Sequence, residues 1–226
     1  MRVIEHPRVA PERRWGAEQY RTLELAGQSA GAIYHLMTAM IVPRPIALIS
    51  TVGEQGQLNV APFSFFNGVC SDPPILSVAI IRHPVSAERP DPESRLKDTA
   101  RNIRRTGEFV VNIAPVSLAA AVETAGKSWP TEQSEAEICG LEALPSLKVA
   151  VPRLGNCPIQ LECRLERIVE VGQGPTDLVL GRIVEAHAAL EVFGDKGRLD
   201  VDRILPLSRL SAGSYAGLQE SFRFVF

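Results

Sequence analysis

The sequence predicts a mainly β protein, a Greek-key-like antiparallel β-barrel with peripheral helices. Runs of strand length recur along the chain, about seven to nine in number, and many are rich in β-branched residues. Turns containing glycine or proline separate neighbouring runs, which indicates hairpin connections, and only about two or three short stretches carry helix signals. Because side chains fill a barrel of this size, a flat ligand would lie outside it or at a subunit interface, which predicts a dimer.

The composition is that of an ordinary globular protein. With 226 residues and 45% hydrophobic content, one domain with a sizeable core is expected. The net charge of −2 and the pI near 6.1 provide no positive field for nucleic acid, so that class of partner is disfavoured. No apolar segment approaches the roughly 18 residues of a membrane helix, and the N-terminus lacks the apolar core of a signal peptide. We therefore expect a soluble cytoplasmic protein.

The cysteine and histidine residues form no sequence-local metal motif. No two cysteines have C-x-x-C spacing, and no two histidines are four residues apart. The residues concerned are Cys70, Cys139, Cys157, Cys163, His6, His35, His83 and His187. We expect reduced thiols and no metal site.

Residues 1–30 are polar and irregular, and we expect an extension that lies across the main domain or a partner subunit. Residues 34–40 form a short amphipathic helical piece that must end before Pro43, because the residue preceding a proline avoids the helical region. His35 within it is expected to pack or cap rather than catalyse.

The stretch 41–72 is predicted to be a hairpin. Residues 46–52 are apolar and uncharged like a buried strand, 53–56 read as a turn, and 58–66 read as the returning strand. Both strands end in hydroxyl, amide or aromatic groups. This combination suits a flat ligand with a polar rim.

Residues 75–81 predict a third strand, on which Ser77 and Ala79 share one face by the two-residue period. Two interpretations remain open, tight packing against another strand or a slot for a ring system. The charged, proline-rich segment 82–95 that follows is predicted to be an exposed loop.

A helix is expected to begin at Asp98 or Thr99 as its cap and to run to about Thr106. Free N–H groups at its start, with Lys97, Thr99 and Asn102 around them, could cradle a phosphate group. A capped helix with a solvated basic face explains the same residues, and spacing alone favours that simpler interpretation.

The remaining chain predicts further strands and one more helix. A strand is expected over 109–113, followed by a helix over 118–124 that is capped by Ser117. Trp129 is expected in a loop, where it could be a packing lid, a subunit contact or a cover over a ligand. Residues 158–165 alternate like a half-exposed strand, with the inward residues being Ile159, Leu161, Cys163 and Leu165. Residues 177–185 return as its hairpin partner. His187 then reads as an edge residue rather than a pocket residue.

A series of motifs is spread in order between about residues 34 and 224. They include PRPIALIST (43–51), NVAPFSFFN (59–67), SDPP (71–74), KDT (97–99) with 102–103, GEFVVN (107–112), 139–141, 161–163, 181–184 and 209–215. In this order they resemble the flavin reductase-like proteins, which are FMN-binding split β-barrels related to flavoredoxin. The resemblance implies that fold and an FMN site.

The resemblance also implies how the site is divided. Around the isoalloxazine ring and ribityl chain it would place Arg44, Pro45, Ile46, Ser50, Thr51, Ala61, Pro62, Phe63, Ser64 and Asn67. Ser77 and Ala79 would be small because the cofactor lies against them. The phosphate would sit on Lys97, Thr99 and Asn102, which reverses the preference that spacing alone gave to that segment.

The implied function is that of an FMN-dependent oxidoreductase. The simplest form is a homodimeric NAD(P)H:flavin reductase that takes hydride from NADH or NADPH and serves a partner monooxygenase or redox protein. A flavoredoxin-like electron carrier and a flavin-binding protein without turnover are the alternatives. No catalytic residue is assigned, because hydride transfer to flavin is the chemistry of the cofactor.

The chain departs from the family pattern in two places. Residues 211–213 are Ser-Ala-Gly where relatives often carry Gly-Gly, and residues 1–30 have no counterpart. The expected domain therefore covers 31–226.

Overall fold

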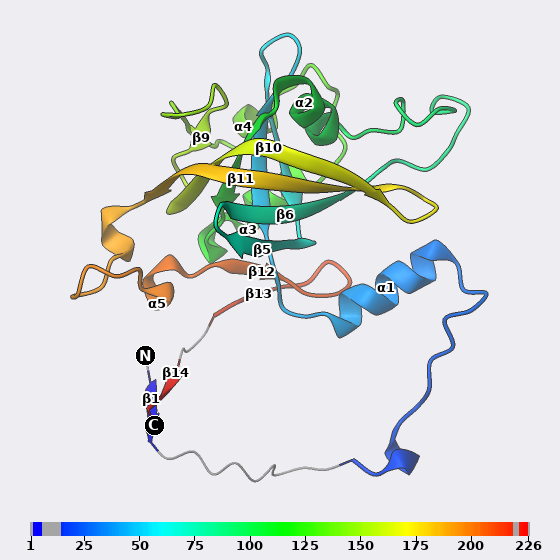
Figure 1. The fold of residues 1–226 in the computed structure, drawn as a ribbon, viewed down its shortest axis with the longest axis horizontal. Coiled ribbons are helices and arrows are strands. Elements are labelled where there is room, and N and C mark those ends of the chain that lie inside the picture. The colour runs from blue at the N-terminus through cyan, green and yellow to red at the C-terminus, as the bar shows by residue number, and fades with distance from the viewer. Residues whose placement is uncertain (1, 6–14, 219–221, 226) are drawn as a thin grey trace.

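The computed structural model describes residues 2–5, 15–218 and 222–225. Its centre is a seven-stranded antiparallel sheet in the order β4-β3-β7-β10-β11-β6-β5 (Figure 1). The strands of this sheet are β3 (Ala47–Val52), β4 (Leu58–Phe63), β5 (Phe66–Ser71), β6 (Pro74–Ile81), β7 (Glu108–Ile113), β10 (Ile159–Val171) and β11 (Thr176–Ala188). The predicted mainly β fold is confirmed.

The sheet curls because its two edge strands are neighbours in the chain. Only Ser64 and Phe65 separate β4 from β5, so the ends of the sheet must approach each other. The N–H of Ala79 on β6 donates to the carbonyl of Phe65 (2.9 Å), which continues the pairing into this corner. The barrel is therefore split at the end of β4.

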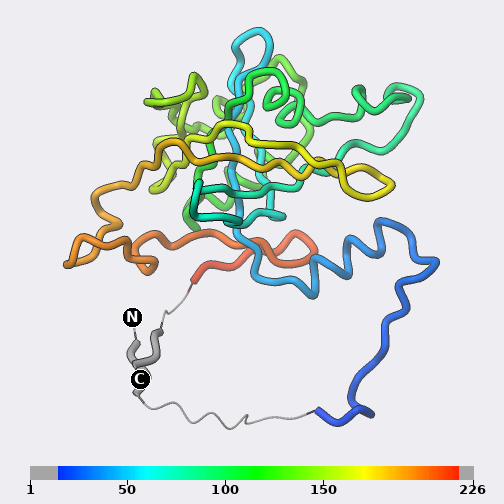
Figure 2. The backbone as a smooth tube through the Cα atoms, in the orientation of Figure 1, coloured from blue at the N-terminus to red at the C-terminus, as the bar shows by residue number. Residues whose placement is uncertain are grey.

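Short strands and helices surround the barrel (Figures 1 and 2). The short strands are β2 (Arg44–Pro45), β12 (Leu207–Arg209) and β13 (Tyr215–Gly217) in one sheet, β8 (Ala143–Leu144) with β9 (Arg153–Leu154), and β1 (Arg2–Glu5) parallel to β14 (Phe222–Val225). The α-helices are α1 (Ala30–Met40), α2 (Asp98–Thr106), α3 (Ala119–Ala125), α4 (Glu135–Ile138) and α5 (Val201–Ile204). The 3-10 turns are Ala17–Gln19, Val116–Leu118 and Leu190–Val192. No helix in the described part of the chain is both long enough and apolar enough to cross a membrane.

The main core fills the barrel. Phe109 is fully buried, and a Cβ placed on Gly181 of β11 would lie 2.3 Å from its ring, so this glycine makes room for the aromatic ring. Cys163 is a core thiol, as predicted. A second buried cluster lies between the barrel and the helices α3 and α4, and it includes Leu48, Val60, Val122 and Ala136.

Several local predictions are wrong in detail. The run 58–66 is not one strand, because β4 ends at Phe63 and the chain turns into β5, which pairs with β6. Helix α2 has Lys97 at its N-cap without a side-chain cap, so neither Asp98 nor Thr99 caps it. Ser117 does not cap α3 either, because a 3-10 turn precedes that helix.

The outer face of β10 is buried at the start of the strand, where the alternation predicted exposure, and is exposed from Arg164 onward. Leu161, Cys163 and Leu165 pack on the core, but Glu162 on the other face is 0% exposed. Its carboxylate accepts hydrogen bonds from the backbone N–H groups of Leu147 (2.8 Å) and Lys148 (2.6 Å). The loop that contains Leu147 and Lys148 covers this part of the strand. The alternation of residues along β10 cannot show that a separate loop will pack on it.

Candidate functional site

Two adjoining hollows form a groove beside the split of the barrel. One holds about 300 Å³ and borders the start of α2, and the other holds about 270 Å³ and borders β13. Both are lined by Pro62 and Phe63 at the end of β4, and by Gly126 and Lys127 of the loop after α3. A Cβ on Gly126 would lie 3.3 Å from Cγ of Pro62, so a side chain there would crowd the floor of the groove.

Helix α2 is anchored firmly enough to define one end of the groove. Ala100 and Ile103 are buried in the barrel core. Arg104 binds Asp177 of β11 (2.8 Å), whose fully buried carboxylate also pairs with Arg82 (2.6 Å). These contacts hold the helix so that its N-terminus faces the groove.

The start of α2 presents an unsatisfied cation. Lys97 is half-buried at the N-cap, and within the described residues no acceptor contacts its ammonium group. Burial lowers its pKa below the ordinary value of 10.5. A half-buried lysine beside uncapped helix N–H groups is a favourable place for an anion.

A buried amide orients the hydroxyl groups behind this position. The Nδ2 group of Asn59 donates to Thr51 Oγ1 and to Thr99 Oγ1, both at 3.1 Å. Asn102 donates to the same Thr51 oxygen (3.1 Å). Because the Thr99 oxygen accepts from Asn59, its own hydrogen is free to donate into the groove that Thr99 lines.

The same end of the groove gathers charge of both signs. His83 and Arg89 come from the loop after β6 and add to Lys97. Burial, and then the positive charges of Arg89 and Lys97, lower the pKa of His83 below 6.5. Glu135 also lines the groove, and burial raises its pKa although Val60 N–H donates to it (3.0 Å). Both shifts favour the neutral forms.

The other end of the groove is built around two arginines. Arg44 is 5% exposed, and its guanidinium donates to the carbonyls of Thr38 (2.6 Å) and Leu210 (2.8 Å). It also donates weakly to Ser64 Oγ (3.4 Å), a groove residue. Burial lowers the pKa of Arg44, and the neighbouring Arg209 adds to that effect. Arg44 therefore holds α1 and the 210–214 turn in place and orients Ser64.

Arg209 forms a cluster with Tyr215 and Glu123. The Tyr215 hydroxyl donates to Glu123 (2.5 Å), Arg209 donates to the same carboxylate (3.1 Å), and the guanidinium lies 4.4 Å from the centre of the Tyr215 ring. Burial and the bond to Glu123 raise the pKa of Tyr215 to about 12. The phenol therefore stays protonated, and its one O–H donor is committed to the Glu123 carboxylate.

The structure gathers some of the predicted site residues and separates others. Those that line the groove are Ile46, Ala61, Pro62, Phe63, Ser64, Lys97 and Thr99. Those that support it from behind are Arg44, Thr51 and Asn102. Those that do not line it are Pro45, Ser50, Asn67, Ser77 and Ala79.

The separated residues have other contacts. Ser50 is 0% exposed and donates to the carbonyl of Pro152 (2.7 Å), so its hydroxyl group serves the core. Ser77 donates to the carbonyl of Asn67 (3.4 Å) along the exposed edge formed by β5 and β6. In the described part of the chain, no group of His, Cys, Asp and Glu is arranged to hold a metal ion.

Sequence reasoning missed several lining residues. His83 and Arg89 lie in a loop that was interpreted only as exposed, and Glu123, Lys127 and Arg209 were not assigned. Trp129, for which a cover over a ligand was one of the open interpretations, lines the groove and donates to the carbonyl of Thr124 (3.0 Å). The charged residues of the 82–95 loop, which are of both signs, were the available signal.

Comparison with known proteins identifies the family. A model described as "Flavin reductase like domain" matches residues 38–203, which is most of the chain. The protein belongs to the flavin reductase-like family. This membership accounts for the split barrel and for the order of the motifs along the chain.

The chain is also similar to several solved structures. Nitrilotriacetate monooxygenase component B from Bacillus cereus has a TM-score of 0.81 and 35% identity, covering 90% of this chain and 98% of the other. Pseudomonas fluorescens 2-nitrobenzoate 2-nitroreductase has a TM-score of 0.78 and 30% identity, covering 91% and 96%. A protein with a split barrel domain from Shewanella frigidimarina is 18% identical with a TM-score of 0.73, covering 88% and 94%, and supports the fold alone.

Proposed function

We propose that this flavin reductase-like protein binds FMN in the groove and works as an NAD(P)H-dependent flavin reductase. The observation that carries the proposal is the half-buried Lys97, without an acceptor among the described residues, at the uncapped start of α2. A phosphate there would restore to the ammonium the interactions that burial removes. The Thr99 hydroxyl, already oriented by Asn59, would donate a further hydrogen bond.

The rest of the groove fits the other parts of FMN. The two hollows meet at Pro62 and Phe63. With the phosphate beside Lys97, the ribityl chain would therefore run along the end of β4. The ring would then lie toward Ser64, Arg209 and Tyr215, where the serine hydroxyl and the remaining N–H groups of Arg209 would offer hydrogen-bond donors. Bound FMN would supply the hydride-accepting chemistry, and these residues would bind and orient it.

A homodimer is part of the proposal. Helix α1 carries no Asp, Glu, Lys or Arg, its one buried residue is Thr38, and it exposes Tyr34 (42%), Met37 (38%) and Met40 (58%). An apolar helix face of this kind is typical of a subunit contact. Because Tyr34 also lines the groove, a partner seated on α1 would border the ring end of the site. Light scattering coupled to size-exclusion chromatography tests this, and a monomer at micromolar concentration would contradict it.

The functional test begins with the visible spectrum of the purified protein after addition of FMN. A protein that is colourless and does not bind added FMN at equilibrium contradicts every flavin-based function. If FMN is bound, anaerobic mixing with NADH and with NADPH follows, and prompt bleaching by either supports the reductase. Bleaching only by a reduced redox protein supports a flavoredoxin-like carrier, and no bleaching by any donor leaves a flavin-binding protein without turnover.

Two possible electron acceptors follow from the relatives. The monooxygenase component of Bacillus cereus makes an oxygenase partner a reasonable acceptor, served by reduced flavin. The Pseudomonas fluorescens nitroreductase makes direct reduction of a nitroaromatic acid a second candidate. Reoxidation of the reduced protein by 2-nitrobenzoate under argon distinguishes them, because the first role predicts no reaction with this compound.

A further inference from the structure

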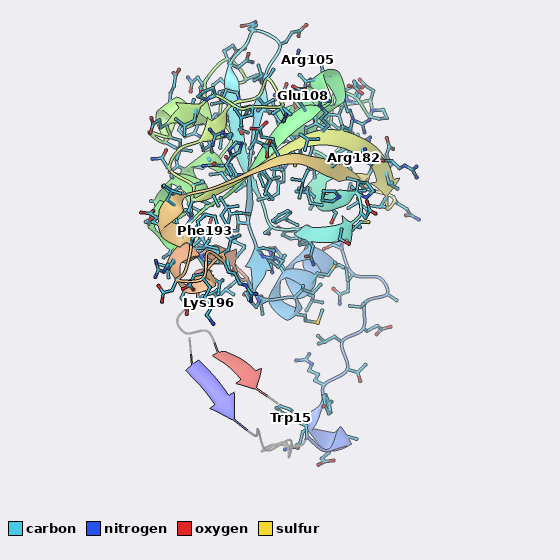
Figure 3. The ribbon with its side chains drawn as sticks, turned by 60° about the vertical axis from the view of Figure 1, so that its left-hand side comes forward. Trp15, Arg105, Glu108, Arg182, Phe193 and Lys196 are labelled. Atoms are coloured by element: carbon cyan, nitrogen blue, oxygen red, sulfur yellow. The ribbon has the colours of Figure 1, made fainter. Side chains whose placement is uncertain are left out.

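A second cavity lies apart from the groove. It holds about 790 Å³ and shares no lining residue with either hollow of the groove. Its walls come from the paired ends of β10 and β11, the 153–158 turn, the 115–117 turn and the end of α5. In Figure 3 the chain leaves this end of β11 toward Phe193, whereas Arg182 lies toward the opposite end of the same strand. The cavity has no role in the proposed flavin chemistry.

One wall of the cavity holds a rigidly positioned arginine. Gln160 is 6% exposed, and its amide donates to the carbonyls of Leu154 (3.0 Å) and Cys157 (2.5 Å). The amide oxygen is thereby aimed at Arg153, whose Nη1 donates to it (2.9 Å) while Nε donates to the carbonyl of Pro145 (3.1 Å). Within the described residues no carboxylate pairs with Arg153, and its Nη2 forms no hydrogen bond. The guanidinium therefore keeps one donor edge and its full charge for a ligand.

A fixed imidazole lies beside this arginine. His187 is directly opposite Gln160 in the β10–β11 pairing, and directly opposite residues of an antiparallel pair share one face of the sheet. Its Nε2 lies 2.6 Å from the buried Glu162 carboxylate. Burial alone would raise the pKa of Glu162, but the N–H groups of Leu147 and Lys148, together with His187, lower it. The ionised carboxylate only accepts, so Nε2 donates, and Nδ1 remains unbonded within the described residues.

The remaining surface of the cavity is mostly balanced in charge or apolar. Arg203 is paired with Asp200 (3.5 Å), and Glu191 is the acidic lining residue. The apolar lining residues are Pro115, Val116, Leu144, Pro158, Ile204 and Leu205. Val116 and Leu205 are 42% and 47% exposed, so this apolar wall is open to a ligand. A cavity with an apolar wall and a few convergent polar groups is typical of small-molecule sites.

We propose that this cavity binds an organic carboxylate with an apolar body, with the carboxylate on Arg153 beside His187 and the body against Val116 and Leu205. Guanidinium and carboxylate groups match in geometry and charge, which favours a carboxylate over a neutral polar group. The site is independent of the proposed flavin function, because no residue is common to the two.

Benzoate is the probe for this site. The full chain, isotopically labelled and saturated with FMN, is titrated with benzoate at pH 7 and followed by amide chemical shifts, with benzamide and inorganic phosphate as comparisons. We expect shifts at 153–160 and 186–191, with binding of benzamide and phosphate at least tenfold weaker. Arg153→Gln should weaken benzoate binding by about 10- to 100-fold, the usual loss for one charge-assisted contact. Arg182→Gln is the matched control, because it removes an arginine that pairs with Glu166 (2.9 Å) outside the cavity.

Several outcomes would overturn the proposal. One is the absence of benzoate-induced shifts at 153–160. Another is an Arg153→Gln variant that binds benzoate as tightly as the unchanged protein does. A third is phosphate binding as tightly as benzoate. Shifts confined to the groove with a changed flavin spectrum would place benzoate at the flavin instead. If Arg153→Gln does not fold, Arg153→Lys keeps the charge but loses the guanidinium fork, and unchanged affinity in that variant would equally exclude the proposed contact. If FMN does not bind, the titration is run on the flavin-free chain, so failure of the two proposals is distinguishable.

Discussion

Replacement of Lys97 and Thr99 by alanine is the sharpest test of the phosphate position. Lys97 lies half-buried at the N-cap of α2 without an acceptor among the described residues, and Thr99 is 2% exposed with its oxygen already bonded to Asn59. In the complex each would make a hydrogen bond to a dianionic phosphate. A hydrogen bond to a charged group contributes about 1.5–3 kcal/mol, so each single variant should weaken FMN binding by roughly 10- to 150-fold.

The double variant should lose less than the sum of the two single effects. Lys97 and Thr99 would act on the same phosphate, and contacts that share a partner are not additive. FMN affinity is measured from the quenching of flavin fluorescence at fixed ionic strength. Arg105→Ala is the matched control, because it removes one positive charge from the far end of the same helix, where Arg105 donates to the carbonyl of Val52 (2.7 Å) (Figure 3).

The control separates a local contact from a general electrostatic effect. Arg105→Ala should change the FMN dissociation constant less than about twofold, as expected for an exposed charge. If Lys97→Ala and Arg105→Ala weaken binding equally, the effect is long-range attraction and not a phosphate contact. Unchanged FMN affinity in the double variant would show that the phosphate is held elsewhere.

Three further predictions concern pH, acid stability and core packing. Because burial and the positive charges of Arg89 and Lys97 lower the pKa of His83 below 6.5 and a phosphate would raise it, FMN binding should strengthen as the pH falls toward that lowered pKa, and His83→Asn should lose this pH dependence in parallel titrations. The lowered pKa of Glu162 contributes stability above pH 4.5 that is lost as pH falls through the folded-state pKa. Glu162→Gln should therefore lower the unfolding free energy in urea at pH 7 by about 1–3 kcal/mol, because the backbone N–H groups of Leu147 and Lys148 lose a charged acceptor, and it should flatten the acid dependence. Gly181→Ala should lower it by about 1–3 kcal/mol because the new methyl would meet the Phe109 ring at 2.3 Å, whereas Gly174→Ala, with open space around it, should change it little.

Local pattern was sufficient for most of the strands. Apolar runs such as 75–81 and 109–113 became β6 and β7 because strand pairing suits β-branched residues wherever both faces are covered. Gly107 ended α2 with φ of 69°, a conformation that glycine adopts without strain. The division of 58–66 into β4 and β5 was not visible in the pattern, because both pieces are apolar and only the closure of the barrel breaks them at Ser64.

The site was predictable to the extent that contiguous motifs build it. Residues 61–64 line the groove because they occupy the end of β4 at the split of the barrel, and Lys97 and Thr99 line it because α2 begins there. Ser50 belongs to the first motif, residues 43–51, but is fully buried and bonds to the carbonyl of Pro152, and Ser77, which lies in no motif, bonds along the sheet edge. Neighbours in sequence alternate sides on a strand, so a motif alone cannot tell which members face a ligand.

The sequence by itself determined the fold class and the family, because strand periodicity and ordered motifs are properties of short segments. Tertiary structure alone decided that His83 and Arg89 join Lys97, that Arg209 meets Tyr215 and Glu123, and that Glu162 is buried under a distant loop. It also brought Arg153 beside Gln160 and His187 in a cavity that no sequence motif predicted. Charges and hydrogen bonds act over a few ångströms of space, whatever the separation along the chain, so these groupings exist only once the barrel has closed.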